Sequence, residues 1–313
     1  MSNETYINEF ILLGLPEFHR LKIPFYSLLL LMYLLSVTGH GLIIIVVLME
    51  SKLHTPMYFF LVNFSLAEIC STTAETPKML INIFSGKSNI CFVCCMAQVF
   101  AVFAMGAVEF IMLTVMSFDR YVAICKPLLY KTIMTNTRCL HLALLAWVGG
   151  FVIIFSQSVV VWTYPYCKHN VIDHFFCDIG PLLRLACADT TLMELIGLIY
   201  GATFMWGSFG FSLISYTYIV ATIIGIPSAT GRSKAFFTCA SHLTVVIIFY
   251  TADMFMYLRP STHGDTEVNK VVSLVRTSFI PILNPFIYTI RNKDFKAAAW
   301  RAMKRNIFFR NSV

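Results

Sequence analysis

Charged residues are scarce in this chain of 313 residues. Asp, Glu, Lys and Arg make up 12% of it, hydrophobic residues make up 58%, and the mean hydropathy is +0.75. A soluble domain usually carries about a quarter charged residues. A single water-soluble core is therefore excluded at this length, and the composition predicts a protein whose solvent is the lipid bilayer.

Sequence signals of several other functional classes are missing too. The chain has no Gly-x-Ser-x-Gly motif and no His-rich cluster placed for the inner membrane face, so we do not expect an enzyme. It shows no pore-filter motif of a channel, and no paired halves of the kind that transporters carry. The net charge of +7 follows membrane sidedness, so no nucleic-acid partner is predicted.

Long apolar runs are abundant, and each is about long enough to cross the hydrocarbon as a helix. The runs are continuous rather than alternating, which favours helices over a barrel. We predict an all-α membrane protein with a seven-transmembrane domain over residues 25–290, between an outer tail at 1–24 and an inner segment at 291–313. The predicted spans are 25–49, 57–82, 95–119, 140–162, 195–224, 237–258 and 271–290.

Basic residues set the predicted orientation. With the first residues outside, 14 of the 23 Lys and Arg fall on inner segments and 9 on outer segments and outer helix ends. This bias places the N-terminus outside the cell. The first stretch lacks the pattern of a cleavable signal peptide, so the first helix is expected to act as an uncleaved insertion signal.

The two ends of the chain carry further signals. The sequon Asn3-Glu4-Thr5 falls on the outer tail, where Asn3 is a glycosylation candidate. Residues 292–303 combine apolar residues near helical spacing with Lys and Arg. This pattern predicts a short amphipathic helix on the inner leaflet; the alternative is a disordered basic tail.

Six tracts at the ends of the predicted helices form an ordered set. They are LHTPMYFF at 53–60, PKML at 77–80, MSFDRYVAIC at 116–125, SY at 215–216, KAFFTCASHL at 234–243 and PILNPFIY at 281–288. Together they resemble the rhodopsin-like G-protein-coupled receptors and, more narrowly, the tetrapod-type (class II) odorant receptors. The resemblance runs from about Asn8 to Lys296.

The chain departs from that family's pattern at several places. Gly39 is followed by His40 where the family usually has Asn, and Glu68 stands where Asp is usual. Phe237 replaces Ser, and Thr251 replaces the Gly of a Phe-Tyr-Gly tract. We expect His40 to weaken the polar contact between the first, second and seventh helices.

Cysteines mark the outer face. The resemblance implies that Cys95 pairs with Cys177 and that Cys167 pairs with Cys187, so that a long loop forms a roof over the helices. Cys91 and Cys94 compete with Cys95 in sequence, because spacing alone does not fix connectivity.

The same loop also contains residue types that bind metal ions. An oxidised cysteine is no thiolate ligand, so we expect a packed loop histidine and no metal. The residues considered are His169, His174, Cys177 and Asp178.

The resemblance places a ligand pocket under the roof, between the third, fifth, sixth and seventh helices. Its aromatic and aliphatic lining suits small, mostly apolar volatile molecules, for which burial gives modest affinity. Asp253 has two readings: it contacts a polar or amine group of the ligand, or it pairs with Arg276 or Arg259 or faces water near the rim. The predicted lining is Val102, Phe103, Gly106, Ala107, Tyr200, Phe204, Tyr250, Asp253, Tyr257, Leu274 and Thr277.

Two further acids lie at matching depth. Glu68 and Glu109 fall where related receptors hold a sodium ion or a proton near Asn284. Two close carboxylates do not both ionise cheaply, and a shared proton or a cation resolves this. The alternative is that each acid is simply protonated and hydrogen-bonded. No other cofactor is expected.

The inner ends of the helices carry the implied switch. By resemblance, activation releases Arg120 from Asp119 in the Asp119-Arg120-Tyr121 motif, and Tyr216 and Tyr288 then become its partners. His242 is expected to hold an inactive contact with the third helix. Pro285 supplies a hinge, since proline removes a backbone hydrogen bond.

These features imply an odorant receptor in the plasma membrane of sensory cilia. Its implied partner is a heterotrimeric stimulatory (olfactory) G protein that raises cyclic AMP; the need for a trafficking chaperone is left open. The alternative is the same receptor machinery tuned to a non-odorant metabolite outside the nose.

Overall fold

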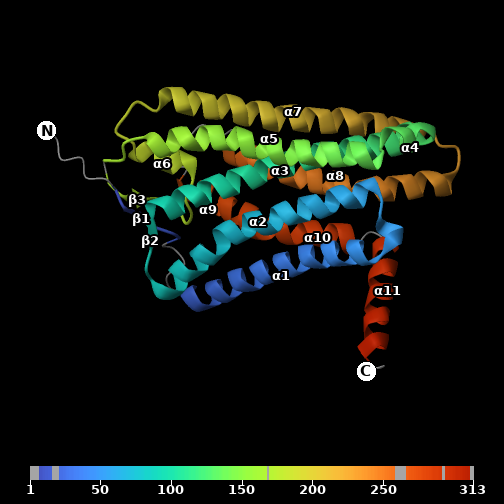
Figure 1. Cartoon of the computed structure of the whole chain (residues 1–313), viewed down its shortest axis with the longest axis horizontal. Helices are drawn as coiled ribbons and strands as arrows, with labels where there is room; N and C mark the ends of the chain where they lie inside the picture. The colour runs from blue at the N-terminus through green and yellow to red at the C-terminus, as the bar shows by residue number, and fades with distance from the viewer. Residues whose placement is uncertain (1–6, 16–20, 168, 258–265, 291–292, 311–313) are drawn as a thin grey trace.

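Seven long helices run side by side as one bundle (Figure 1). The computed structural model describes residues 7–15, 21–167, 169–257, 266–290 and 293–310. The seventh helix is built from α9 (Thr266–Leu274), a π-helical turn η4 (Val275–Phe279) and α10 (Ile280–Ile290). The other six are α1 (Lys22–Met49), α2 (Pro56–Ser85), α3 (Phe92–Cys125), α5 (Asn136–Thr163), α7 (Thr191–Ile224) and α8 (Ala229–Tyr257).

This bundle confirms the predicted all-α fold, and each expected span lies within one of these helices except for the last residue of the sixth, which lies outside the described residues. Among the described residues, five helices are long and apolar enough to cross a bilayer by length and composition alone. The second, α2, carries Glu68, Glu75 and Lys78, and the apolar part of α8, Cys239–Phe255, is shorter. These charges and this shorter apolar part keep α2 and α8 out of that set of five, and their place in the bundle completes the seven.

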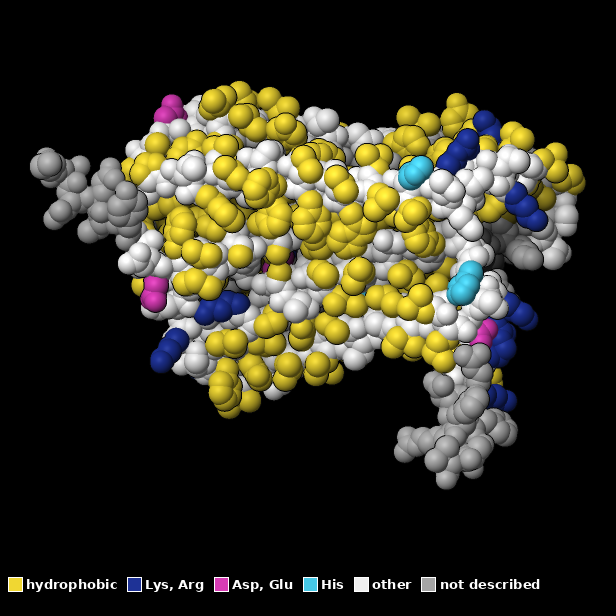
Figure 2. All heavy atoms as spheres, in the orientation of Figure 1, with side chains coloured by type: hydrophobic (Ala, Val, Ile, Leu, Met, Phe, Trp, Pro, Cys, Tyr) yellow, Lys and Arg dark blue, Asp and Glu magenta, His cyan; other side chains and the backbone are white. Residues whose placement is uncertain are grey.

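Apolar side chains cover the sides of the bundle (Figure 2), and they include Leu48, Leu145 and Ile214, all more than half exposed. Lys and Arg side chains gather toward the two ends of this face. Such an apolar belt is stable in contact with lipid tails, because its side chains are not exposed to water there.

A small sheet closes the outer end. The strands β1 (Glu9–Leu12), β2 (Asn89–Cys91) and β3 (Val171–Ile172) lie in the order β2-β1-β3. Strand β1 pairs antiparallel with β2 and parallel with β3. The sequence analysis predicted an outer tail over 1–24 and no strand in it or in the outer loops, because strands as short as these show no alternating pattern.

Short helices occupy the loops and the inner end. The outer loop contains α6 (Ile179–Leu185), and the inner loops contain η2 (Ser51–Leu53), η3 (Pro127–Leu129) and α4 (Tyr130–Ile133). After the seventh helix, α11 (Lys293–Arg310) runs away from the bundle axis (Figure 1). Its buried residues Phe295 and Ala298 pack on the bundle, and Arg301 pairs with Glu50 at 3.1 Å, so the helical reading of this segment holds.

The first helix lies close against the seventh at Gly39. A Cβ built there would lie 2.9 Å from Cγ of Pro285, whose ring is rigid. We expect Gly39→Ala to push α1 away from α10 and to cost about 1–3 kcal/mol of stability, as overpacking does. Surface level and melting temperature measure the effect.

Gly41→Ala is the matched control, because no described atom lies within 4 Å of a Cβ at that position. Equal behaviour of the two variants would contradict the close-contact explanation.

Candidate functional site: a buried charge cluster under a disulfide-closed roof

Buried acids line one small cavity between α2, α3 and the π-helical turn η4. Glu68, Glu75 and Glu109 border it together with Arg276 and Thr277. The three carboxylates are almost fully buried, and the cavity leaves about 10 Å³ for the centre of a water-sized sphere. That is room for about one water molecule or one small cation.

Arg276 joins three helices at this cluster. It lies in η4, and a single π-helical turn is a common feature of functional sites. Its Nε donates a hydrogen bond to Oδ1 of Asp253 in α8 at 2.6 Å, and its Nη2 lies 4.0 Å from Oε2 of Glu109 in α3. A Cβ at Gly106 would lie 3.4 Å from Nη2, so the glycine leaves room for the guanidinium.

Of the two readings of Asp253, the structure therefore places the ion pair with Arg276. The side chain is fully buried, and Arg276 is one of the two partners that the sequence suggested. The other candidate, Arg259, lies outside the described residues.

Glu68 and Asn284, two members of the predicted ion site, are in direct contact. The amide Nδ2 of Asn284 donates to Oε1 of Glu68 at 2.6 Å. Glu109 borders the same cavity as Glu68, so the structure brings both acids of the predicted ion site together.

Sequence reasoning missed Glu75. Its side chain is 3% exposed, and neither carboxylate oxygen has a hydrogen-bond partner among the described residues. Glu75 stands seven residues after Glu68, which places both on one face of α2 two turns apart. This spacing was the signal that could have found it.

Most of the predicted pocket lining points into the bundle. Tyr250 is buried at its centre, with its ring 5.3 Å from Phe110 in α3 and 5.2 Å from Phe209 in α7. Tyr200 is 42% exposed on α7, and the side chain of Tyr257 lies outside the described ones. Ligand contact by these residues stays a prediction. Buried or partly buried are Val102, Phe103, Gly106, Ala107, Phe204, Leu274 and Thr277.

The roof is fastened by disulfides. Cys95 is bonded to Cys177 and Cys167 to Cys187, the two pairings that the resemblance implies. Cys91 and Cys94, the competitors in sequence, are bonded to each other instead.

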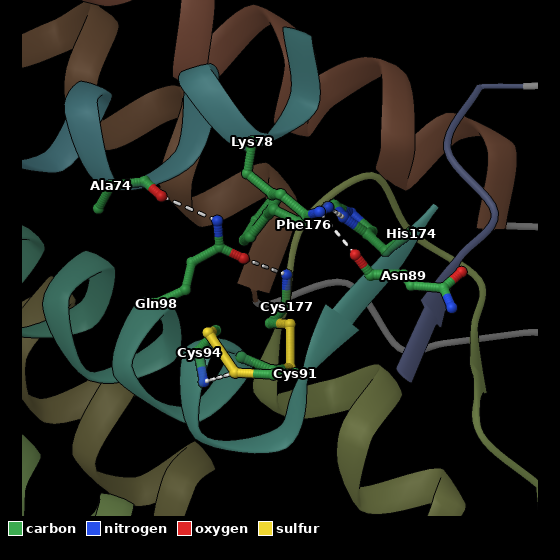
Figure 3. The surroundings of a disulfide bond; sticks show 10 residues. Ala74, Lys78, Asn89, Cys91, Cys94, Gln98, His174, Phe176 and Cys177 are labelled. Atoms are coloured by element: carbon green, nitrogen blue, oxygen red, sulfur yellow. Dashed lines mark hydrogen bonds between the residues drawn. A yellow bond between two sulfur atoms is a disulfide. The ribbon is translucent and has the colours of Figure 1, made fainter. Parts of the chain in front are cut away.

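Gln98 ties the roof to two helices (Figure 3), and sequence reasoning gave it no role. Its Nε2 donates to the carbonyl oxygen of Ala74 in α2 at 2.8 Å, and its Oε1 accepts from the backbone N–H of Cys177 at 2.9 Å. One amide on α3 therefore holds α2 and the outer loop in register.

A second contact holds the roof to the seventh helix. Nζ of Lys270 lies 2.7 Å from Oδ1 of Asp173, with the lysine 1% and the aspartate 51% exposed. Next to it, the ring of His174 stacks on Phe175 and meets Phe176 edge-on. The described residues contain no group of three or more His, Cys, Asp or Glu placed to hold a metal ion. The structure shows His174 as a loop histidine packed against Phe175 and Phe176.

His174 makes the roof sensitive to acid. Burial, followed by the nearby Lys270, lowers the pKa of His174 from 6.5 to about 3. A depressed pKa gives stability that is present above pH 6.5 and is lost as the pH falls toward 3. We expect the melting temperature to drop over this window, and the drop to be smaller in His174→Gln.

Asp178 changes the dependence of stability on pH in the opposite direction to His174. Burial raises the pKa of this outer-loop acid to about 6, so stability falls as the pH rises from 3.8 to 6. The comparison is therefore made in an Asp178→Asn background, and a pH profile unchanged by His174→Gln would contradict the role of His174.

The inner end holds the predicted switch residues in two separate contacts. Arg120 donates to Oδ2 of Asp119 at 2.6 Å, and Tyr130 donates to Oδ1 of the same carboxylate at 2.8 Å. The hydroxyl of Tyr216 lies 2.6 Å from Nδ1 of His242, which links α7 to α8. A contact between His242 and α3 stays a prediction.

Three more predicted switch residues frame this end. Tyr121 packs its ring against Tyr218 at 6.0 Å, and Pro285 lies inside α10. The side chain of Tyr288 is buried, and its hydroxyl has no hydrogen-bond partner in the described part of the chain. The hydroxyl is therefore available to a new partner.

The weakening expected at His40 stays a prediction, but its side chain does reach the seventh helix. Its Nε2 donates to the carbonyl oxygen of Pro281 in α10 at 3.0 Å, so a polar contact between the first and seventh helices is present. The imidazole of His40 is longer than the side chain of the usual Asn, and it reaches that carbonyl oxygen directly.

Seven membrane-spanning helices, a disulfide-closed outer end, a buried charge cluster and an Asp-Arg pair at the inner end define a multi-pass membrane receptor. Residues 29–306 match the family model described as Olfactory receptor. The chain is 51% identical to human Olfactory receptor 6X1 over 97% of each chain, and 44% identical to human Olfactory receptor 6C1 over 99% of each. It is 46% identical to Olfactory receptor 6E1 of Mus musculus over 95% of each. The chain therefore belongs to the olfactory receptor family: it is an odorant receptor and a multi-pass plasma-membrane protein.

Proposed function

We propose that the chain binds small, mostly apolar volatile molecules in the bundle and activates a stimulatory olfactory G protein, which raises cyclic AMP. The observation that carries this is the Arg120–Asp119 pair, which lies near the end of α3 opposite to the roof-bonded Cys95. A G-protein helix that enters between α3 and α8 would need this arginine released.

The route from pocket to inner end runs along α8. Tyr250 and Asp253 on this helix lie in the predicted pocket region, and His242 lies further along the same helix in contact with Tyr216. A ligand that binds better when α8 shifts outward would change the population of the two states. The Tyr216–His242 bond breaks in that shift.

A sodium ion or a shared proton is proposed in the cavity bordered by Glu68, Glu75 and Glu109. Three buried carboxylates facing one arginine leave excess negative charge, which is costly unless a cation or protons offset it. Glu75 would join Glu68 and Asn284 in holding the cation. The cavity has room for about one such ion.

The test is a cyclic-AMP reporter assay with the olfactory G protein and a chemically diverse odorant panel that includes amines. We expect a ligand-dependent rise that falls at least tenfold in Arg120→Ala. Lys131→Ala, at an exposed position of α4, is the control at matched surface level. A response that survives in Arg120→Ala would contradict the proposed coupling.

A non-odorant metabolite is the second candidate ligand class, because it would use the same receptor machinery. A receptor at the surface that ignores the whole volatile panel, together with expression outside the nose, would favour it.

A further inference from the structure

Three cysteines stand within five residues at the start of α3, and their two disulfides differ in access. Cys95 and Cys177 are both fully buried. Cys91 and Cys94, which are bonded to each other, are both exposed at the outer end. An incoming molecule in the outer solvent therefore reaches one of these disulfides and not the other.

The exposed bridge has the arrangement Cys91-Phe92-Val93-Cys94 across the beginning of a helix. Cys91 ends β2 and caps α3, and its Sγ accepts a hydrogen bond from the backbone N–H of Cys94 at 3.0 Å (Figure 3). The positive end of the helix dipole and such an N–H favour a thiolate. The sulfur that is the better leaving group is therefore Cys91.

Residues of β1 and α2 fix the backbone that carries this sulfur. Strand β2 pairs with β1, with Glu9 opposite Cys91, and Lys78 donates to the carbonyl oxygen of Asn89 at 2.6 Å. The backbone around Cys91 is thus fixed by contacts that do not depend on the bridge, so the bridge can open without loss of the sheet.

We propose that Cys91 and Cys94 form a thiol–disulfide exchange site for small thiols on the outer face of the receptor. A small thiol loses its proton to solvent, and its thiolate attacks Sγ of Cys94. A mixed disulfide forms on Cys94, the Cys91–Cys94 bond breaks, and the electron pair leaves with Cys91 as the thiolate. A second thiolate attacks the small-molecule sulfur of the mixed disulfide; this step releases the symmetric small disulfide and leaves Cys94 and Cys91, each of which takes up a proton.

Thiol–disulfide exchange at this site would affect the structure less than exchange at the roof bridges. Opening Cys95–Cys177 would release the outer loop from α3, whereas opening Cys91–Cys94 leaves both roof bridges intact. The modification would change the charge and bulk beside β1 and β2 while the receptor stays folded. Small thiols, including volatile ones, are the reactant class that fits the exposed position.

The test uses the full-length receptor in lipid nanodiscs, held in glutathione buffers of stepped thiol-to-disulfide ratio. Free thiols are then alkylated and mapped by mass spectrometry, with cleavage after Phe92 separating Cys91 from Cys94. We expect half-maximal alkylation of Cys91 and Cys94 at a ratio at least tenfold less reducing than that for Cys95 and Cys177. Cys91–Cys94 opening at the same ratio as Cys95–Cys177, or at a more reducing one, would overturn the proposal.

Two single variants test the assignment of the leaving group. Cys94→Ser keeps the N–H that faces Cys91, and Cys91→Ser keeps a side chain that caps α3. We expect the free Cys91 of the first variant to react with oxidised glutathione several-fold faster at pH 7 than the free Cys94 of the second. In the double variant Cys91→Ser/Cys94→Ser, alkylation at low thiol ratio should be confined to the cysteines that are free in the structure, which are Cys70, Cys125, Cys139 and Cys239. Labelling of any further cysteine at that ratio would contradict the site.

Discussion

Replacing Arg276 with Gln is expected to abolish most folded receptor at the cell surface. The guanidinium is the cation bonded to Asp253 at 2.6 Å, and it also faces Glu109. Removing one partner of a buried ion pair costs about 3–5 kcal/mol, because the other charge is left buried. Surface labelling and the melting temperature of the receptor in nanodiscs measure the loss.

Variants at Asp253 decide whether the pair itself is the cause. Asp253→Asn keeps an oxygen that accepts from Nε of Arg276, so we expect a smaller loss. The double variant Asp253→Asn/Arg276→Gln should recover part of the folded level of Arg276→Gln. If the two single effects simply add, the residues are not coupled, and the pairing would not explain the loss.

The second large effect is expected from the double variant Cys95→Ser/Cys177→Ser. These cysteines are 82 residues apart. A bridge that closes such a loop lowers the entropy of the unfolded chain, which stabilises the folded receptor by about 4.5 kcal/mol. This value is an upper bound here, because the helices stay in the bilayer and limit the unfolded chain. We expect the melting temperature to fall furthest in this variant.

The other bridges serve as its controls, because they close shorter loops. Cys167 and Cys187 are 20 residues apart and Cys91 and Cys94 only 3. The same relation gives about 3.3 and about 1.6 kcal/mol, so the three double Ser variants should rank in that order. A larger effect at Cys91–Cys94 than at Cys95–Cys177 would contradict this ranking.

The spans were predictable because lipid imposes a simple rule. A helix that crosses the hydrocarbon must be about 20 apolar residues long, and this holds whatever the neighbouring helices are. The expected spans at 25–49 and 195–224 differ from α1 and α7 by a few residues at one end. The switch residues followed from ordered motifs rather than from hydropathy.

Features made by pairs that are distant in sequence were not predictable in the same way. The sequence offered both Arg276 and Arg259 as partners of Asp253 without choosing between them, and no pattern in 275–279 announces the π-helical turn that carries Arg276. Glu75 was within reach of helical spacing, yet its neighbours come from α3 and η4. The Cys91–Cys94 bridge competed with other pairings, and spacing does not choose among them.

The outer sheet has a consequence for the order in which the receptor is made. Strand β1 is synthesised first, but its partner β3 follows about 160 residues later. At roughly 5–20 residues per second, β1 waits on the order of 10–30 s before its second edge is paired. An unpaired strand edge can pair with other chains. The newly made receptor therefore exposes an N-terminal edge that is open to such pairing in the endoplasmic reticulum until β3 has been synthesised.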